Sequence, residues 1–202
     1  MKKILCYGDS NVFGFNPENG KRFNKNSRWS GILDELLDNY EVIEKGLNNR
    51  VGFVDNPVGF EYSAKYNLEH ELRKYNNIEI LILAVGTNDF QFQYKISEET
   101  IEKELLELIK IALKNCQKII LIPPVEIQAD ILNSYFSIMF DETCIQKTKS
   151  ISKIYKKLAE INNCEYFNFN DFTKPSKIDG LHYEIESHRL IAQKLAKFIQ
   201  NI

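Results

Sequence analysis

Three residues that together can pass a proton lie at opposite ends of this chain. Ser10 follows a short apolar run, and Asp179 and His182 stand three residues apart near the C-terminus. A serine hydroxyl is a weak nucleophile at neutral pH unless an imidazole takes its proton and a carboxylate orients that imidazole. Gly180 permits the tight turn that would bring both partners into one cleft. We therefore predict Ser10 as nucleophile, His182 as general base and acid, and Asp179 as the orienting carboxylate.

The composition excludes several other kinds of function. The chain has 202 residues and a formal net charge of −2, with lysines spread among glutamates. We expect one domain over residues 1–202, no nucleic-acid partner and no stable membrane association. Asp9 interrupts the first apolar run, so no secretory signal is expected and the predicted location is cytoplasmic. Scattered cysteines and only three histidines predict reduced thiols, no metal site and no cofactor.

Apolar runs alternate with longer helix-period segments along the chain, which predicts an α/β fold with a parallel sheet. The run at 80–85 is apolar without alternation, as expected of a strand covered by helices on both faces. A helix at 98–115 has a periodic apolar stripe, and Ser97 is its expected N-cap. The predicted strands are 3–7, 41–45, 80–85, 118–122 and 165–169, and the other predicted helices are 29–37, 60–75, 144–162 and 184–199.

The candidate residues follow these predicted strands, where sites form in open α/β sheets. Gly8-Asp9-Ser10 follows the first strand, Gly46-Leu47-Asn48 the second and Gly86-Thr87-Asn88-Asp89 the third. Asp179-Gly180-Leu181-His182 precedes the last helix. Taken alone, each has a simpler interpretation, because serine, asparagine and Asp-Gly pairs are common in caps and turns. Their joint order along an α/β chain is much more specific.

These motifs resemble the SGNH (GDSL) hydrolase superfamily, whose four sequence blocks supply Ser, Gly, Asn and His. The corresponding residues here are Ser10, Gly46, Asn88 and His182, with Asp179 three residues before the histidine. The resemblance runs nearly end to end and is strongest to the arylesterase and acyltransferase branch. It implies a flavodoxin-like three-layer α/β/α sandwich with a five-stranded parallel sheet. It also implies an oxyanion hole formed by the backbone N–H groups of Ser10 and Gly46 and the side-chain amide of Asn88.

The chain departs from the family pattern beside these blocks, which affects the expected substrate specificity and not the proton-transfer groups. Asn11 replaces the leucine that many relatives carry after the serine, Phe13 replaces a tryptophan, and the second block reads Gly46-Leu47-Asn48-Asn49-Arg50. Many phenylalanines fall in the expected loops around the site and would line an apolar pocket, although packing under loops or a subunit contact explains them equally well. The predicted substrate-binding residues are Asn11, Phe13, Phe53, Phe90 and Phe136; Phe15, Phe92 and Phe140 lie in the same loops.

The resemblance implies an esterase that hydrolyses small, short-chain or aryl carboxylic esters through an acyl-enzyme, with transesterification as a further outcome. Alternatives within the superfamily are a carbohydrate O-deacetylase, a lysophospholipase and a thioesterase. An alternative of another class is a non-catalytic flavodoxin-like binding module in which Gly8-Asp9-Ser10 cradles a phosphate. In such a module Asp179 and His182 would have no functional role. Self-association through the exposed aromatic side chains is a third interpretation, which does not exclude catalysis, and the long connection 123–142 is a candidate lid.

Overall fold

The computed structural model describes residues 1–202 and contains one parallel sheet of five strands in the order β2-β1-β3-β4-β5. The strands are β1 (Lys2–Gly8), β2 (Tyr40–Gly46), β3 (Ile78–Ala84), β4 (Cys116–Leu121) and β5 (Glu165–Tyr166). Every neighbouring pair runs parallel. The predicted α/β class and sheet are therefore confirmed.

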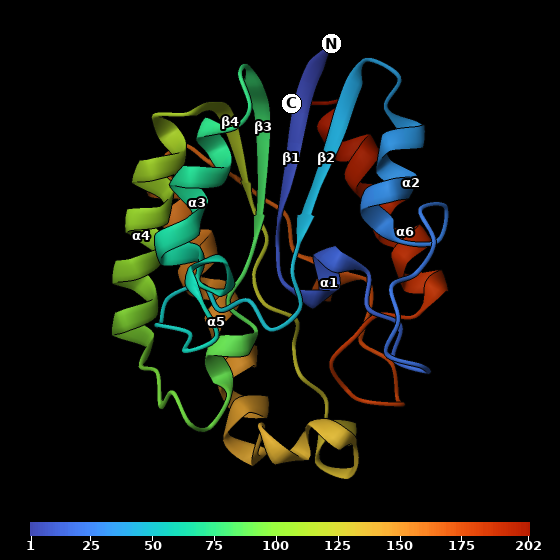
Figure 1. The fold of residues 1–202 in the computed structure, drawn as a ribbon, viewed down its shortest axis with the longest axis vertical. Helices are drawn as coiled ribbons and strands as arrows, with labels where there is room; N and C mark the ends of the chain where they lie inside the picture. The colour runs from blue at the N-terminus through green and yellow to red at the C-terminus, as the bar shows by residue number, and fades with distance from the viewer.

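Helices cover both faces of this sheet, as Figure 1 shows. Helices α2 (Trp29–Leu36) and α6 (Ile185–Ile199) lie on one side, together with the short α1 (Ser10–Phe13). Helices α3 (Ala64–Arg73), α4 (Glu98–Leu113) and α5 (Glu142–Ile161) lie on the other. Five short 3-10 helices occur in the connections, at Phe60–Tyr62, Asn88–Phe90, Ala129–Asn133, Tyr135–Ile138 and Phe169–Asp171. No helix is long and apolar enough to cross a membrane.

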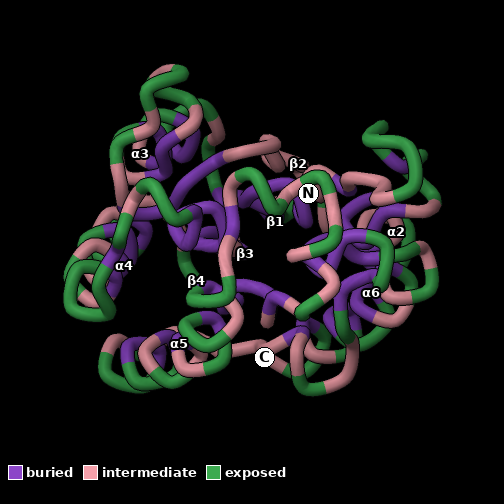
Figure 2. Tube along the Cα trace, turned by 90° about the horizontal axis from the view of Figure 1, so that it is seen from below, coloured by how far each residue is buried: buried purple, intermediate pink, exposed green.

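The core forms where the sheet meets the inner helix faces, and Figure 2 shows the exposed positions on the outside of these layers. Strand β3 is buried along most of its length, as expected of a central strand with both faces covered. Helix α4 buries its periodic stripe, and the Ser97 side chain accepts a hydrogen bond from the N–H of Thr100, as predicted. The stripe consists of Ile101, Leu105, Leu108, Ile109 and Ala112.

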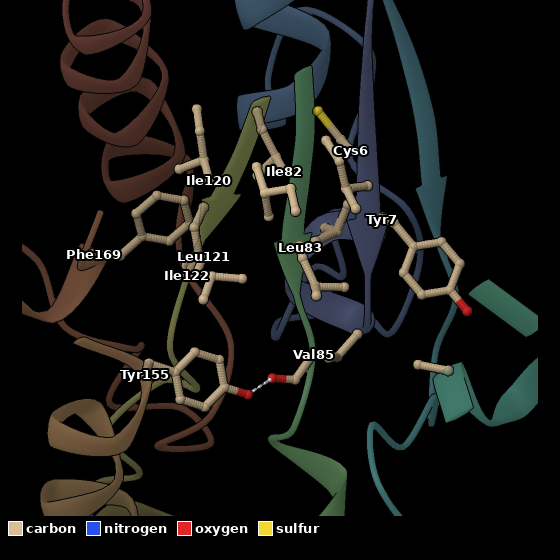
Figure 3. Packing of buried hydrophobic residues seen from close by; sticks show 14 of the residues in the cluster. Cys6, Tyr7, Ile82, Leu83, Val85, Ile120, Leu121, Ile122, Tyr155 and Phe169 are labelled. Carbon is tan, nitrogen blue, oxygen red and sulfur yellow. Dashed lines mark hydrogen bonds between the residues drawn. The ribbon is translucent and has the colours of Figure 1, made fainter. Parts of the chain in front are cut away.

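Polar contacts inside the core fix the strand ends from which the site is built. The Tyr155 hydroxyl of α5 donates a hydrogen bond to the carbonyl oxygen of Val85 at 2.7 Å, just after β3 (Figure 3). The Tyr7 hydroxyl of β1 donates to Asn67 Oδ1 in α3 at 3.1 Å. Cys6 packs in the same core, and burial raises the pKa of its thiol. A thiol held protonated in this way is a poor nucleophile.

Three elements differ from the sequence-based expectation. The predicted helix 60–75 is divided into a 3-10 helix at Phe60–Tyr62 and α3 at Ala64–Arg73, because Ser63 between them is extended. Strand β5 has only two residues, because the chain turns at Asn168, whose side chain accepts from the N–H of Asn170 and begins a 3-10 helix. Helix α1 begins directly at Ser10 and was not predicted. Asp9 caps its N-terminus, and Gly14 ends it after a single turn with φ of +81°, a left-handed conformation that glycine adopts without strain.

Candidate active site

The turn that presents Ser10 is built by the two residues that precede it, Gly8 and Asp9. The side chain of Asp9 accepts a hydrogen bond from the N–H of Asn11 at 3.0 Å. Burial raises the pKa of this carboxyl, while the hydrogen bond from Asn11 lowers it. Gly8 lets the chain leave β1 closely packed, because a Cβ there would lie 2.2 Å from the carbonyl oxygen of Ala84. Ser10 thus occupies the first position of a helix, directly beyond a central strand.

The structure brings Ser10, His182 and Asp179 together, although the first two are 172 residues apart. Ser10 Oγ lies 2.8 Å from His182 Nε2, and His182 Nδ1 lies 2.7 Å from Asp179 Oδ2. All three residues are buried. The arrangement is a continuous hydrogen-bonded chain from hydroxyl to imidazole to carboxylate, the geometry that lets an imidazole remove the serine proton.

Asp179 is held in place by the turn it begins. Its Oδ1 accepts hydrogen bonds from the backbone N–H groups of Leu181 and His182, both at 2.9 Å, which leaves Oδ2 for the imidazole. Gly180 has φ of +66°, and a Cβ there would lie 2.6 Å from the backbone nitrogen of Ile131. Both the conformation and the packing therefore favour glycine at this position.

Two phenylalanines enclose the imidazole. The ring of Phe15 lies 4.2 Å from the ring of His182, centroid to centroid, and the ring of Phe136 lies 5.1 Å from it. Phe136 belongs to the connection 123–142, so this long segment contributes directly to the site. The two aromatic rings limit the orientations open to the imidazole.

A cavity of about 210 Å³ opens beside Ser10 and His182. Its lining combines side-chain amides with apolar groups. The lining residues other than Ser10 and His182 are Phe15, Asn48, Asn49, Asn88, Phe136, Met139 and Leu181. An ester carbonyl bound here would meet amide donors next to the serine, and its apolar substituent would contact phenyl and thioether groups.

Two of the three predicted oxyanion-hole donors are at this cavity. The N–H of Ser10 is the first of its helix, where N–H groups have no partner within the helix. The side chain of Asn88 donates from Nδ2 to the carbonyl oxygen of Arg50 at 3.0 Å, which leaves its second N–H available. Both groups can therefore donate to a bound oxygen.

The third predicted donor, Gly46, is not among the residues that line the cavity. Gly46 ends the edge strand β2 and packs on the backbone of α1, where a Cβ would lie 2.0 Å from the nitrogen of Phe13. Asn49 lines the cavity instead, with φ of +61°. Its backbone N–H forms no hydrogen bond with another residue. Gly46 is therefore closely packed on α1, and Asn49, three residues further along, is a residue of this turn that lines the cavity and has an unbonded N–H.

Of the predicted substrate-binding residues, only Phe136 lines the cavity. The Asn11 side chain is buried and donates to the carbonyl oxygen of Leu181 at 3.2 Å. The guanidinium carbon of Arg22 lies over the ring of Phe13, 4.9 Å from the ring centroid. Phe53 and Phe90 are buried in the core. These residues lie close to the site in the sequence, but their side chains turn towards the protein interior or towards other loops.

Five cavity residues were not predicted as substrate-binding: Phe15, which was only placed in the surrounding loops, and Asn48, Asn49, Met139 and Leu181. The Asn-Asn pair after β2 was the available signal, because asparagine is the residue other than glycine that most readily adopts positive φ. No group of three or more His, Cys, Asp or Glu side chains is arranged to hold a metal ion.

Comparisons with known proteins agree with this geometry. The family model described as GDSL-like Lipase/Acylhydrolase matches residues 4–195. The native aryl esterase of M. smegmatis is 26% identical, with a TM-score of 0.91 over 100% of this chain and 99% of that one. A carbohydrate acetylesterase from Sinorhizobium meliloti is 25% identical, with a TM-score of 0.89 over 100% and 99% of the two chains. A search of curated protein sequences found no match. The chain therefore belongs to the GDSL-like lipase/acylhydrolase family and is a serine hydrolase of ester bonds.

Proposed function

We propose that the chain hydrolyses small carboxylic esters with a short acyl group or an aryl leaving group, through an acyl-enzyme on Ser10. The observation that carries this proposal is the hydrogen-bonded chain of Ser10, His182 and Asp179, with 2.8 Å and 2.7 Å between the partner atoms. The serine is already in contact with the nitrogen that would remove its proton, beside a cavity able to hold an ester.

In the first step Ser10 Oγ attacks the ester carbonyl carbon while its proton passes to His182 Nε2. The carbonyl oxygen becomes an oxyanion that accepts from the N–H groups of Ser10 and Asn49 and from Asn88 Nδ2. The imidazolium, stabilised by Asp179, then gives its proton to the leaving alcohol. Water then attacks the acyl carbon and loses a proton to His182, which returns that proton to Ser10 Oγ as the acyl–Oγ bond breaks and the acid leaves. An alcohol in place of water would give transesterification.

The size and lining of the cavity support a small substrate. A volume of about 210 Å³ is below the range of roughly 300–1,000 Å³ usual for drug-sized ligands. Phe15 and Phe136 provide flat apolar contacts for a phenyl leaving group. The likeness to the M. smegmatis aryl esterase supports the same substrate class.

A carbohydrate O-deacetylase is the second candidate, because three asparagines line the cavity and offer hydrogen bonds to hydroxyl groups. The likeness to a carbohydrate acetylesterase supports it independently. The two candidates share the chemistry on Ser10 and differ in the alcohol that leaves.

The test combines covalent labelling with an ester panel. A fluorophosphonate should label the wild-type chain on the peptide that contains Ser10, and the Ser10→Ala variant should stay unlabelled. Phenyl acetate, p-nitrophenyl esters of increasing chain length and acetylated xylose then rank the substrates, with p-nitrophenyl acetate and phenyl acetate expected to be fastest. Labelling at another residue would overturn the proposed nucleophile. Activity confined to long acyl chains would overturn the short-chain assignment, and a preference for acetylated xylose would favour the second candidate.

A further inference from the structure

Behind the cavity, one buried glutamine contacts two of the amides that line it. Gln91 Nε2 donates to Asn88 Oδ1 at 3.2 Å and to Asn49 Oδ1 at 2.9 Å. The glutamine is 2% exposed and does not line the cavity itself. We propose that Gln91 is a positioning residue that holds the Asn88 amide with its NH₂ group turned towards the reacting carbonyl oxygen. This inference rests on the proposed esterase function and deepens it.

The direction of these hydrogen bonds follows from one acceptor of known polarity. The backbone carbonyl of Arg50 can only accept, so the Asn88 atom 3.0 Å from it must be the NH₂ nitrogen. The carbonyl oxygen of the Asn88 side chain then faces Gln91, and Gln91 must present its own NH₂ group there. Gln91 Oε1 faces away and accepts from Gln93 Nε2 at 3.0 Å. The orientation of each side-chain amide in this hydrogen-bonded series is thereby fixed.

The same glutamine also restrains the second oxyanion segment. One N–H of Gln91 bonds to Asn88 and the other to Asn49, whose backbone N–H is the second donor proposed for the oxyanion. Because both N–H groups of the Gln91 NH₂ are used, Gln91 links the segment that follows β3 to the turn that follows β2. Arg50 completes this link, because it follows Asn49 and accepts from Asn88.

An acceptor at position 91 would act against this arrangement. An ionised carboxylate has no proton to donate, so it attracts the NH₂ group of Asn88 and repels its carbonyl oxygen. The Asn88 amide then turns over, presents an oxygen towards the developing oxyanion and loses its bond to Arg50. A side chain with donors only keeps the original orientation. Whether a substitution at position 91 keeps or reverses the Asn88 amide therefore depends on whether the new side chain donates or accepts hydrogen bonds, and not on its size.

The experiment compares three substitutions at this position, using the full chain and p-nitrophenyl acetate. Gln91→Glu supplies only acceptors, Gln91→Met removes both kinds of group at similar volume, and Gln91→Lys supplies only donors. Removing one oxyanion donor usually lowers kcat by about 10²–10³-fold. We expect Gln91→Glu to lose about 10²-fold in kcat, Gln91→Met about tenfold, and Gln91→Lys less than about fivefold. KM should stay within about threefold in all three, because the oxyanion forms only in the transition state.

Controls separate orientation from folding and from charge. Thermal unfolding shows which variants are folded. Phe92→Glu places the same carboxylate on an exposed neighbour that forms no hydrogen bond with the Gln91 side chain, and a small loss in kcat is expected there. Equal losses in all three variants, or a Gln91→Glu variant within twofold of wild type, would overturn the positioning role. Should Gln91→Glu not fold, the contrast between Gln91→Lys and Gln91→Met decides by itself. A wild-type chain that hydrolyses no ester would instead overturn the proposed function.

Discussion

The side chain of Asn11 donates a hydrogen bond from Nδ2 to the carbonyl oxygen of Leu181 at 3.2 Å. This contact joins the turn that carries Ser10 to the segment that carries His182. The backbone carbonyl of Asn11 also accepts from Trp29 Nε1 at 2.9 Å, which ties the same turn to α2. The residue that follows the nucleophile thus connects two parts of the site and does not line the cavity.

Asn11→Ala should therefore weaken the fold around the site. The substitution leaves the buried carbonyl of Leu181 without its donor, which typically costs about 1–3 kcal/mol. Urea denaturation should show a lower midpoint at an unchanged m-value. Asn201→Ala, which removes a comparable amide from the exposed C-terminal end, should change stability by less than about 0.5 kcal/mol. Equal midpoints for Asn11→Ala and wild type would contradict this role.

Gly46→Ala tests whether this glycine acts through packing. Its Cβ would lie 2.0 Å from the nitrogen of Phe13 and 2.4 Å from the carbonyl carbon of Val12, both backbone atoms of α1. Because backbone cannot rotate away, α1 must shift and take Ser10 with it, so kcat should fall together with a loss of about 1–3 kcal/mol in stability. Gly20→Ala is the control, since its nearest neighbour would be 3.8 Å away. It should lose stability through its positive φ while keeping wild-type kcat, measured with p-nitrophenyl acetate. A fully active Gly46→Ala variant would refute the packing argument.

Asp89 should make the fold less stable as the pH rises. Its carboxylate accepts from the N–H groups of Gly52, Phe53 and Val54 at 2.6–3.2 Å, yet burial raises its pKa to about 7. Between about pH 4 and pH 7 the folded chain holds a proton here that the unfolded chain has released. The free energy of unfolding therefore falls across this window by a few kcal/mol, on the order of 1.4 kcal/mol per pKa unit.

The Asp89→Asn variant cannot titrate at this position and should lack that decrease. Urea denaturation at pH 5 and pH 7 measures the free energy of unfolding for both chains. Asp55→Asn, at an exposed carboxylate, should leave the wild-type slope intact. The idea fails if wild type and Asp89→Asn change in parallel between the two pH values.

His188 should have the opposite effect at acid pH. Its Nδ1 accepts from the N–H of Trp29 at 3.3 Å, its Nε2 is buried without a partner, and burial lowers its pKa to about 3. Between about pH 6.5 and pH 3 the unfolded chain gains a proton here that the folded chain does not. The free energy of unfolding therefore falls as the pH is lowered through this window.

His188→Asn keeps an acceptor and removes the titration, so its stability should fall less between pH 6.5 and pH 4 than that of wild type. The exposed His70 provides the matched control, since His70→Asn should follow wild type. Chemical denaturation at both pH values gives the comparison. Identical acid sensitivity in His188→Asn and wild type would show that another group controls it.

The main features of the fold and the proton-transfer chain could be predicted without coordinates, because they depend on local patterns. An unbroken apolar run marks β3 as a central strand, and the stripe from Ile101 to Ala112 marks the buried face of α4. Parallel strands bring their carboxyl ends to one edge, so residues that follow different strands converge there. Ser10, Asn88 and the Asp179–His182 turn follow this rule, and the structure places them together.

The cavity lining depended on side-chain directions that no local pattern encodes. Asn11, Phe13, Phe53 and Phe90 are adjacent to the site along the chain, yet packing turns them elsewhere. Gly46 packs on the backbone of α1, whereas Asn49, which has positive φ and an N–H without a hydrogen-bond partner in the protein, lines the cavity. By itself the sequence determined which strands and turns carry the chemistry, because periodicity and turn preference act over a few residues. Only the tertiary structure decided which atoms face the substrate, because that depends on contacts between segments far apart in the chain.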